Sequence, residues 1–421
     1  MTVRRFDVVV AGGGLVGMAI AWGIARLGQR VAVCDGDDIA FRAARGNFGL
    51  VWVQGKGGRC VPYARWSRES SERWHAFAAQ LQRETGVDCA FERPGGIELF
   101  EHRAELDGAT DLLESLRRQE AALSYEVLDP AALRRRIPSA SPSLAGALWS
   151  PNDGHANPLY TLRAMLQAFQ RCGGVYLPRS EVSEIRPHAG RFEIDTRHAR
   201  LEAGRVVLAA GLDNARLAPM VDLRAPISPL RGQIMVTERL APFLDYPTLV
   251  VRQTPEGSVL LGDSAEDVGF DDGQTRPAMV DIARRARTAF PALAHARIVR
   301  AWGALRIMTP DGLPVYEAST THPGAFIAIC HSGVTLAATH ADLVAPWIAG
   351  GARAGRPVRL YHRALRRAHG SPACLNPSFP PPRRSNACAS ISTARRTTCP
   401  RNTASRPRCS PPVRPRAARA P

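Results

Sequence analysis

The chain has 421 residues, of which 45% are apolar, and a formal charge of +17 at pH 7. This length allows two domains with substantial cores. No run approaches the roughly eighteen apolar residues of a membrane-spanning helix, and the N-terminus has a strand pattern instead of a signal peptide. Nine cysteines without a CxxC pair or a cluster with histidine favour reduced thiols and no metal site. We therefore expect a cytoplasmic protein, at most peripherally attached to the inner face of a membrane.

The positive charge is concentrated in residues 351–421, which hold sixteen arginines and no acidic residue. The chain before this segment is close to neutral, so no nucleic-acid partner is expected for it. The segment is also rich in proline and serine and poor in aliphatic residues, a composition that cannot bury enough surface to fold.

Three interpretations of this tail remain open: a disordered basic arm, a tail that binds a membrane surface or nucleic acid, and an out-of-frame extension. Arginine outnumbers lysine 54 to 1 in the chain, which is typical of a GC-rich gene. GC-rich DNA that is translated in the wrong frame gives an amino-acid sequence rich in arginine, proline, alanine and serine. The frameshift interpretation is therefore favoured, with the change of frame between residues 351 and 360.

The strongest motif lies near the N-terminus. An apolar strand over residues 6–11 leads directly into a glycine-rich turn, and an amphipathic helical pattern follows as far as Leu27. A second strand over residues 31–34 ends in Asp35, about twenty positions after the glycines. The turn consists of Gly12, Gly13, Gly14, Leu15, Val16 and Gly17. This order predicts a dinucleotide-binding unit, in which the acidic residue accepts hydrogen bonds from a ribose.

Each glycine of the turn has a separate physical role. We expect Gly12 to permit the tight turn and Gly17 to let the helix pack closely on the strand. Gly14 leaves the backbone N–H groups at the helix N-terminus open to a pyrophosphate. The unit alone does not distinguish NAD from FAD.

The remaining elements predict two kinds of layer. Helices are expected over residues 63–85, 103–123, 159–172, 277–290 and 336–348. Strands are expected over residues 175–176, 181–185, 191–196, 205–211, 233–237, 258–262 and 325–329, with a strand, turn and strand over 91–100. The strand at 181–185 is expected to complete a doubly wound sheet.

We predict an α/β fold with two domains. One is a Rossmann-like nucleotide-binding domain, whose parallel sheet has helices on both faces, and the other is a discontinuous α+β substrate domain with an antiparallel sheet. The first is assigned residues 1–85, 146–222 and 300–350. The second is assigned residues 86–145 and 223–299.

Two further segments are candidates for contact with a bound dinucleotide. The loop at residues 41–56 has small residues before an apolar run, so its backbone N–H groups can face phosphates. It ends at Lys56, which is either a solvated loop residue or a group that stabilises negative charge on a reduced flavin. Residues 331–335 open the last helix, where free N–H donors suit an electron-rich oxygen. His331 is either a donor that faces a ligand or a helix cap.

Together these motifs resemble the D-amino acid oxidase and glycine oxidase family of FAD enzymes over nearly all of residues 3–350. In chain order they are GGGLVG with Asp35, RGNFG, VVLAAG, LRGQ, WGALRIMTPDGLPV and HSGVTLA. The resemblance implies FAD as the cofactor, held by both ends of the folded body. Within the family, GNFGLVWVQGKG is similar to the FAD subunits of bacterial opine oxidases, hydrogen cyanide synthase and D-hydroxyproline dehydrogenases.

The resemblance also implies site residues. Arg306 matches the arginine that binds the substrate carboxylate in the signature WxGLRPxTPDGLP, and the plain alternative is a surface or ion-paired arginine. Ile307 stands where the family often has proline. Lys56 and His331 are further candidate catalytic residues. The implied FAD-binding residues are Gly12, Gly13, Gly14, Leu15, Val16, Gly17, Asp35, Arg45, Gly46, Asn47, Gly49, Val182, Ala210, Gly211, Ser332, Gly333, Val334 and Thr335.

We expect FAD-dependent oxidation of a D-amino acid or secondary amino acid, such as D-hydroxyproline, D-proline or an opine, to the imine. The resemblance implies an electron acceptor other than oxygen, of unknown identity. It also implies small iron–sulfur partner subunits, since the chain has no cluster motif of its own. The alternatives are an FAD-dependent oxidase or dehydrogenase of 2-hydroxy acids, a flavin-bearing subunit that is inactive without partners, and a nucleic-acid-binding protein that acts through the tail.

Overall fold

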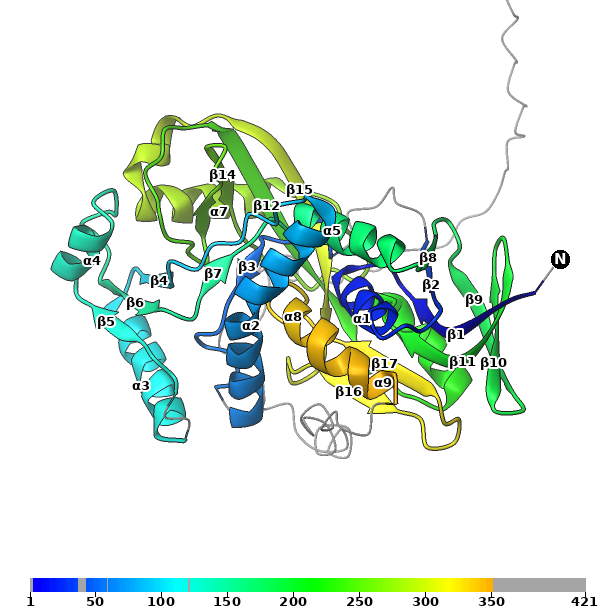
Figure 1. The fold of residues 1–421 in the computed structure, drawn as a ribbon. Helices are drawn as coiled ribbons and strands as arrows, with labels where there is room; N and C mark the ends of the chain where they lie inside the picture. Colours follow the sequence, from blue (N-terminus) through cyan, green and yellow to red (C-terminus); the bar gives the residue numbers. More distant parts are fainter. Residues whose placement is uncertain (1–2, 37–42, 59, 120–121, 351–421) are drawn as a thin grey trace, which may run out of the picture. The chain divides into compact units, whose positions relative to one another are not determined.

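The computed structural model describes residues 3–36, 43–58, 60–119 and 122–350 (Figure 1). The expectations for residues 351–421, and for the first residues of the loop at 41–56, lie outside this part of the chain. No helix in the described residues is long and apolar enough to cross a bilayer.

A mostly parallel sheet carries the glycine-rich turn at the end of its first strand. Its strands are β1 (Arg4–Ala11), β2 (Val31–Cys34), β8 (Val175–Leu177), β9 (Val182–His188), β10 (Arg191–Thr196), β11 (Arg200–Leu208), β16 (Val315–Ala318) and β17 (Ala325–Ile329). The main order is β16-β17-β11-β1-β2-β8, in which only the β16–β17 pair is antiparallel. Val8, Val9 and Val10 of the central β1 are 0% exposed, as expected for a parallel strand covered on both faces. The Rossmann-like sheet is thus confirmed.

The first helix is buried on every side. In α1 (Leu15–Ala25), all residues from Met18 to Ile24 are buried, and α5 (Pro158–Arg171) and α9 (Ala345–Ile348) pack against it. Figure 1 shows α1 between α5 and the last helical segment. Leu27, expected on the apolar face, lies beyond the helix and is 53% exposed. The amphipathic expectation is therefore wrong, because sheet and helices together cover α1 on all sides from Met18 to Ile24.

Two other predicted helices are confirmed together with their ends. The long α2 (Val61–Thr85) stops at Gly86, which has φ +76°, a conformation that glycine adopts freely. Its aromatic face is core: Trp66, Trp74, Phe77 and Leu81 are at most 2% exposed. α5 begins after Asn157, whose side-chain oxygen accepts hydrogen bonds from the backbone N–H groups of Leu159 and Tyr160.

The strand expected at residues 181–185 does join this sheet, but as an antiparallel edge strand. β9 pairs antiparallel with β10, and β8 occupies the place beside β2. Only Ala189 and Gly190, with φ of +47° and +74°, connect β9 to β10. A two-residue connection of this kind makes a hairpin and so excludes a parallel pairing.

Antiparallel strands form the other layers. The larger sheet has the order β13-β14-β12-β15 and the smaller one β4-β6-β5. Their strands are β12 (Ser228–Arg239), β13 (Val251–Gln253), β14 (Ser258–Leu261), β15 (Ile298–Met308), β4 (Gly96–Phe100), β5 (Glu126–Leu128) and β6 (Gly146–Ser150). The associated helices are α3 (Arg103–Gln119), α4 (Pro130–Arg136) and α7 (Arg276–Ala289). Over residues 91–100 the structure has one strand, β4, instead of two, and Glu92 makes a single bridge to His155.

One hydrophobic cluster joins the two antiparallel sheets. It includes Ile97 and Leu128 from the smaller sheet, Val259 from the larger one and Phe290 after α7. Both segments predicted for the substrate domain therefore contribute to a shared core, while the domain boundaries themselves stay a prediction. The short elements are β3 (Leu50–Val51), β7 (Gly154–His155), η1 (Gly211–Asp213), α6 (Asn214–Leu217), η2 (Ala218–Val221), η3 (Pro291–His295), α8 (Ala337–Thr339) and η4 (His340–Val344).

Candidate active site

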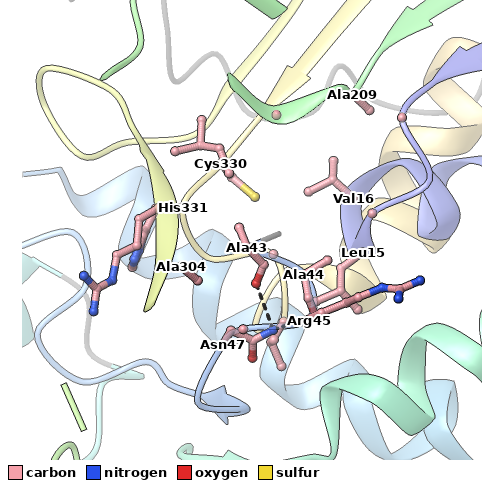
Figure 2. A pocket seen from close by; sticks show the side chains of 18 of the residues that line it. Leu15, Val16, Ala43, Ala44, Arg45, Asn47, Ala209, Ala304, Cys330 and His331 are labelled. Carbon is pink, nitrogen blue, oxygen red and sulfur yellow. Dashed lines mark hydrogen bonds between the residues drawn. The ribbon is translucent and has the colours of Figure 1, made fainter. Parts of the chain in front are cut away.

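A cavity of about 810 Å³ lies where the parallel strands end (Figure 2). Its wall includes the residues that follow β1, β2, β11 and β17, together with parts of β12 and β15. The carboxyl ends of parallel strands are the usual place for a ligand in such a sheet. The antiparallel sheet forms the rest of the wall, so segments far apart in the sequence share one chamber.

The cavity collects the residues that the sequence singled out. Every predicted FAD-binding residue except Gly17 lines it, and so do all three candidate catalytic residues. These lining residues are Gly12, Gly13, Gly14, Leu15, Val16, Asp35, Arg45, Gly46, Asn47, Gly49, Lys56, Val182, Ala210, Gly211, Arg306, His331, Ser332, Gly333, Val334 and Thr335. Gly17 lies behind the turn in the packing between strand and helix.

The glycines of the turn have different surroundings. Gly12 has φ +106°, and a Cβ there would lie 2.4 Å from the Ala209 carbonyl oxygen. A Cβ on Gly17 would lie 2.0 Å from the carbonyl oxygen of Gly12. Gly14 is the N-cap of α1, and a Cβ there would meet only the Cβ of Ala44, at 3.6 Å. Two glycines are thus needed for packing, whereas a side chain at Gly14 would fill the cavity in front of the helix N-terminus.

Asp35 lies at the end of β2 and is 7% exposed. Its Oδ2 accepts a hydrogen bond from the Tyr176 hydroxyl at 3.1 Å, and a Cβ on Gly13 would lie 3.0 Å from the same oxygen. Val182 lines the cavity on this side, and its carbonyl accepts a hydrogen bond from Arg216 at 2.6 Å. The carboxylate is therefore next to the glycine turn, where an adenosine ribose would need it.

The loop at residues 43–49 is shaped by Asn47. Its Nδ2 donates to the Ala44 carbonyl at 3.0 Å, and its Oδ1 accepts from the Gly49 N–H at 2.8 Å. Figure 2 shows Asn47 beside Ala43, Ala44 and Arg45. Trp302 of β15 donates to the Gly46 carbonyl at 3.1 Å, which fixes the loop against the antiparallel sheet.

Lys56 is held inside the site. Its Nζ donates hydrogen bonds to Ser332 Oγ at 2.7 Å and to Thr335 Oγ1 at 3.0 Å. The Tyr63 hydroxyl lies 2.9 Å from the same Ser332 oxygen. Burial lowers the Lys56 pKa to about 8. The alternative of a solvated loop residue is therefore wrong.

His331 faces the cavity as a neutral imidazole. Burial, and then the positive charges of Arg306 and Lys56, lower its pKa to about 3. The last helical segment begins at Ala337, with Leu336 as its N-cap. The alternative that His331 caps this helix is therefore wrong.

Arg306 extends from β15 over Gly232 of β12. A Cβ on Gly232 would lie 2.4 Å from the guanidinium carbon. Nη1 donates to the carbonyls of Ser264 at 2.7 Å and Arg231 at 3.2 Å, and Nη2 is ion-paired with Asp263. The arginine is thus ion-paired, as the plain alternative supposed, but its side chain is only 15% exposed and lines the cavity.

Sequence reasoning missed three residues of this wall. Tyr63 was expected only as the start of a helix, and Asp263 was not singled out. Gly232 lies within the LRGQ motif, which carries part of the family resemblance. The motif does not indicate that Gly232 leaves room for the Arg306 guanidinium. The long-range pairing of β12 with β15 creates that role, and no local pattern indicates it.

The polar groups present fit an adenine dinucleotide with a flavin. The open helix N-terminus at Gly14 and the carboxylate of Asp35 suit a pyrophosphate and a ribose. At the other end of the cavity, Lys56, Ser332 and Thr335 offer a positive charge and hydroxyl groups to an electron-rich ring.

Comparisons with known proteins agree with this geometry. Residues 7–347 match the family model described as FAD dependent oxidoreductase. The chain is 40% identical over 347 residues to an opine oxidase subunit of Agrobacterium tumefaciens (strain Ach5), covering 82% of this chain and 94% of that one. It is 29% identical to the hydrogen cyanide synthase subunit HcnC of Pseudomonas aeruginosa, covering 74% of this chain and 84% of the relative.

A solved structure has the same fold. Glycine oxidase from Geobacillus kaustophilus superposes with a TM-score of 0.78 and 25% identity, covering 82% of this chain and 95% of that chain. The α/β architecture and the family resemblance are thus confirmed. The chain belongs to the family of FAD dependent oxidoreductases, and FAD is its cofactor.

Proposed function

We propose that the protein oxidises the Cα–N bond of a D-amino acid or secondary amino acid, of the D-hydroxyproline, D-proline or opine type, to the imine. The observation that carries the proposal is the guanidinium of Arg306, which lines the cavity and is held by two backbone carbonyls. The 40% identity to a protein named as part of an opine oxidase supports the substrate class.

In this reaction the side chains bind and orient the substrate and stabilise charge. FAD, when bound, supplies the hydride acceptor. Arg306 binds the substrate carboxylate and so fixes the direction of the Cα–H bond. The neutral His331 and the part-buried Lys56 line the same chamber, where the charge of Lys56 stabilises the negative charge that develops on reduction. The imine leaves the site and is hydrolysed by water.

Variants of Arg306 test the proposal. We expect Arg306→Ala to keep bound FAD but to raise the KM for the amine substrate by about a hundredfold or more, because a charged hydrogen bond to the carboxylate is lost. The exposed Arg287→Ala on α7 is the matched control and should leave KM unchanged. Anaerobic bleaching of the FAD absorbance by D-proline, D-hydroxyproline, an opine, glycine and matched 2-hydroxy acids gives the measurement. An unchanged KM in Arg306→Ala, or reduction by hydroxy acids alone, would contradict the proposal.

We also propose that this chain works as one subunit of a larger enzyme, with small iron–sulfur subunits that pass electrons to an acceptor other than oxygen. Two relatives, from an opine oxidase and from hydrogen cyanide synthase, are themselves named as subunits. Co-purification from the native cell would identify such partners. A free chain that turns over rapidly with oxygen alone would contradict this part of the proposal.

A further inference from the structure

Asp263 forms an ion pair with Arg306 at the wall of the cavity, and both residues line it. The Asp263 side chain is 40% exposed, whereas that of Arg306 is 15% exposed. Carboxylate binding by Arg306 does not explain this arrangement, since the Asp263 carboxylate competes with a substrate carboxylate for the same guanidinium.

The surrounding backbone fixes the two charges. Arg306 Nη1 donates to the carbonyls of Ser264 and Arg231, so the guanidinium cannot turn away from the wall without losing both bonds. The Asp263 carbonyl accepts a hydrogen bond from Arg285 of α7. A positive and a negative group therefore lie side by side in a set geometry.

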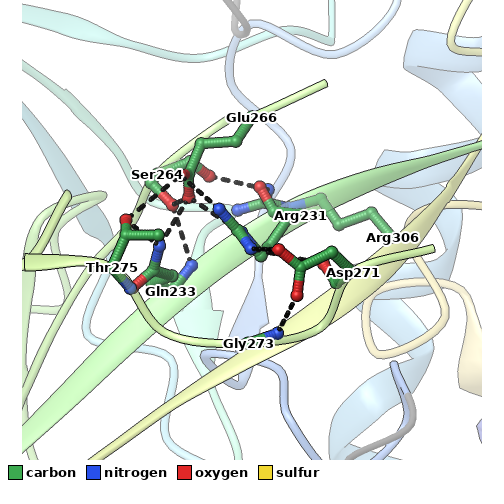
Figure 3. A network of polar contacts seen from close by, with 8 residues as sticks. All are labelled: Arg231, Gln233, Ser264, Glu266, Asp271, Gly273, Thr275 and Arg306. Atoms are coloured by element: carbon green, nitrogen blue, oxygen red, sulfur yellow. Dashed lines mark hydrogen bonds and ion pairs between the residues drawn. The ribbon is translucent and has the colours of Figure 1, made fainter. Parts of the chain in front are cut away.

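The loop that follows Asp263 is anchored to β12 by a polar network around the buried Arg231 and Gln233 (Figure 3). Arg231 is 2% exposed and pairs with Glu266 at 2.9 Å and with Asp271 at 2.6 Å. Gln233 Nε2 donates to the other Glu266 oxygen at 2.8 Å. These contacts connect the loop to β12, which pairs with the Arg306 strand β15. They therefore hold Asp263 in a fixed position relative to Arg306.

We propose that Asp263 recognises the nitrogen of the substrate, so that Arg306 and Asp263 together bind a zwitterionic α-amino acid. This inference rests on the proposed function and specifies its substrate class. The α-carboxylate and the α-nitrogen of an amino acid are neighbouring groups of opposite charge, which complement a neighbouring guanidinium and carboxylate. A carboxylate accepts hydrogen bonds from an ammonium and from a neutral amine alike, so the contact persists when the nitrogen loses its proton.

The pair also selects against ligands that lack nitrogen. A plain carboxylic acid must displace Asp263 from Arg306 and has no N–H group to donate a hydrogen bond to the Asp263 carboxylate. A zwitterion replaces the lost Asp263–Arg306 ion pair with hydrogen bonds from its own N–H groups to Asp263. Removing the charge of Asp263 should therefore have opposite effects on the two kinds of ligand.

The test compares D-proline with tetrahydrofuran-2-carboxylate of the same configuration, in which a ring oxygen replaces the N–H. Both are titrated into the full-length, FAD-loaded protein. Kd is taken from the perturbation of the FAD absorbance, or from half-saturation of anaerobic reduction where the ligand is oxidised. In Asp263→Asn we expect the Kd of D-proline to rise about tenfold and that of the ether to fall.

The exposed Asp267→Asn in the same loop is the control and should leave the ratio of the two Kd values unchanged. Asp263→Asn keeps an acceptor for Arg306, and its FAD content and melting temperature report whether the fold is intact. Parallel changes in both Kd values would overturn the inference even if the enzyme oxidises amines. A protein that oxidises no amine but shows the opposite changes would overturn the proposed function and leave the binding role of Asp263 standing.

Discussion

The ammonium of Lys56 lies 2.7 Å from the hydroxyl oxygen of Ser332, although the two residues are 276 positions apart in the chain. This contact joins the loop after the first βαβ unit to the segment before the last helix, and both line the cavity. The single lysine of the sequence is thus placed where both ends of the folded body meet. Its charge and its accessibility can each be tested.

The first prediction concerns the reactivity of Lys56. Since the chain has no other lysine, an amine-reactive ester can modify only this side chain and the N-terminal amine. With the pKa lowered to about 8, the FAD-free protein should be labelled at Lys56 at a rate that reaches half its maximum near pH 8. Loading with FAD should protect the residue, as mass spectrometry of the labelled peptide would show. A rate that rises only above about pH 10, the range of an ordinary lysine, would show that the site does not lower the Lys56 pKa.

The second prediction concerns the charge of Lys56. In Lys56→Met the cavity loses a positive charge, so the two-electron reduction potential of bound FAD should fall by on the order of 30 mV, which corresponds to about 1.4 kcal/mol. Lys56→Arg keeps the charge and is the matched comparison. Spectroelectrochemical titration of both variants measures the effect. Equal potentials in Lys56→Met and the unmodified protein would show that the charge of Lys56 does not affect the reduction potential of FAD.

Much of the cofactor end of the site could be predicted from the sequence, because its signals are local. The glycine turn and Asp35 both depend on neighbours within one βαβ unit. The burial of Trp66 and Trp74 also follows from helical spacing within α2.

The substrate end could not be predicted in the same way. The position of Arg306 over Gly232 depends on the register of β12 against β15, whose members are far apart in the chain. Asp263 follows an ordinary strand, and nothing in its neighbours indicates an arginine partner. The antiparallel pairing of β9 has a local cause, because only two residues connect it to β10 and they make a hairpin.

The third prediction separates two glycines of the turn. Gly17→Ala should unfold or strongly destabilise the protein, because the new Cβ would lie 2.0 Å from the Gly12 carbonyl oxygen. Gly14→Ala should fold normally, since its Cβ has no contact closer than 3.6 Å, but should bind FAD at least about tenfold more weakly. Circular dichroism melting and FAD titration of the two variants distinguish these effects. Full FAD affinity in Gly14→Ala would show that no group approaches the helix N-terminus closely.

The fourth prediction concerns the space beneath Arg306. In Gly232→Ala the added methyl group would lie 2.4 Å from the guanidinium carbon, so the side chain must move. We expect FAD binding to be retained and the substrate KM to rise about tenfold or more, because the carboxylate partner is displaced. Gly108→Ala in α3, where a Cβ would meet nothing within 4 Å, is the matched control. Steady-state kinetics measures the KM of both variants. Equal KM values in Gly232→Ala and Gly108→Ala would contradict the role of Gly232.

The fifth prediction concerns Asp153, which is 0% exposed beside the loop that carries Lys56. Its Oδ1 accepts hydrogen bonds from the backbone N–H groups of Val53 and Gln54, while Oδ2 has no hydrogen-bond partner in the described part of the chain. Burial raises the Asp153 pKa from 3.8 to about 7, and burial together with Asp153 raises that of Glu98 to about 7.

The sign of the resulting pH dependence follows from proton uptake. Between pH 3.8 and about 7 the folded protein holds a proton on Asp153 that the unfolded chain has lost, so this group lowers the free energy of unfolding as the pH rises through that range. Asp153→Asn keeps the Oδ1 acceptor and removes the charge. It should stabilise the protein by on the order of 1–3 kcal/mol more at pH 8 than at pH 5, as urea unfolding at the two pH values would measure. An equal effect at both pH values would mean that Asp153 is ionised throughout, in contradiction to its burial without a partner for Oδ2.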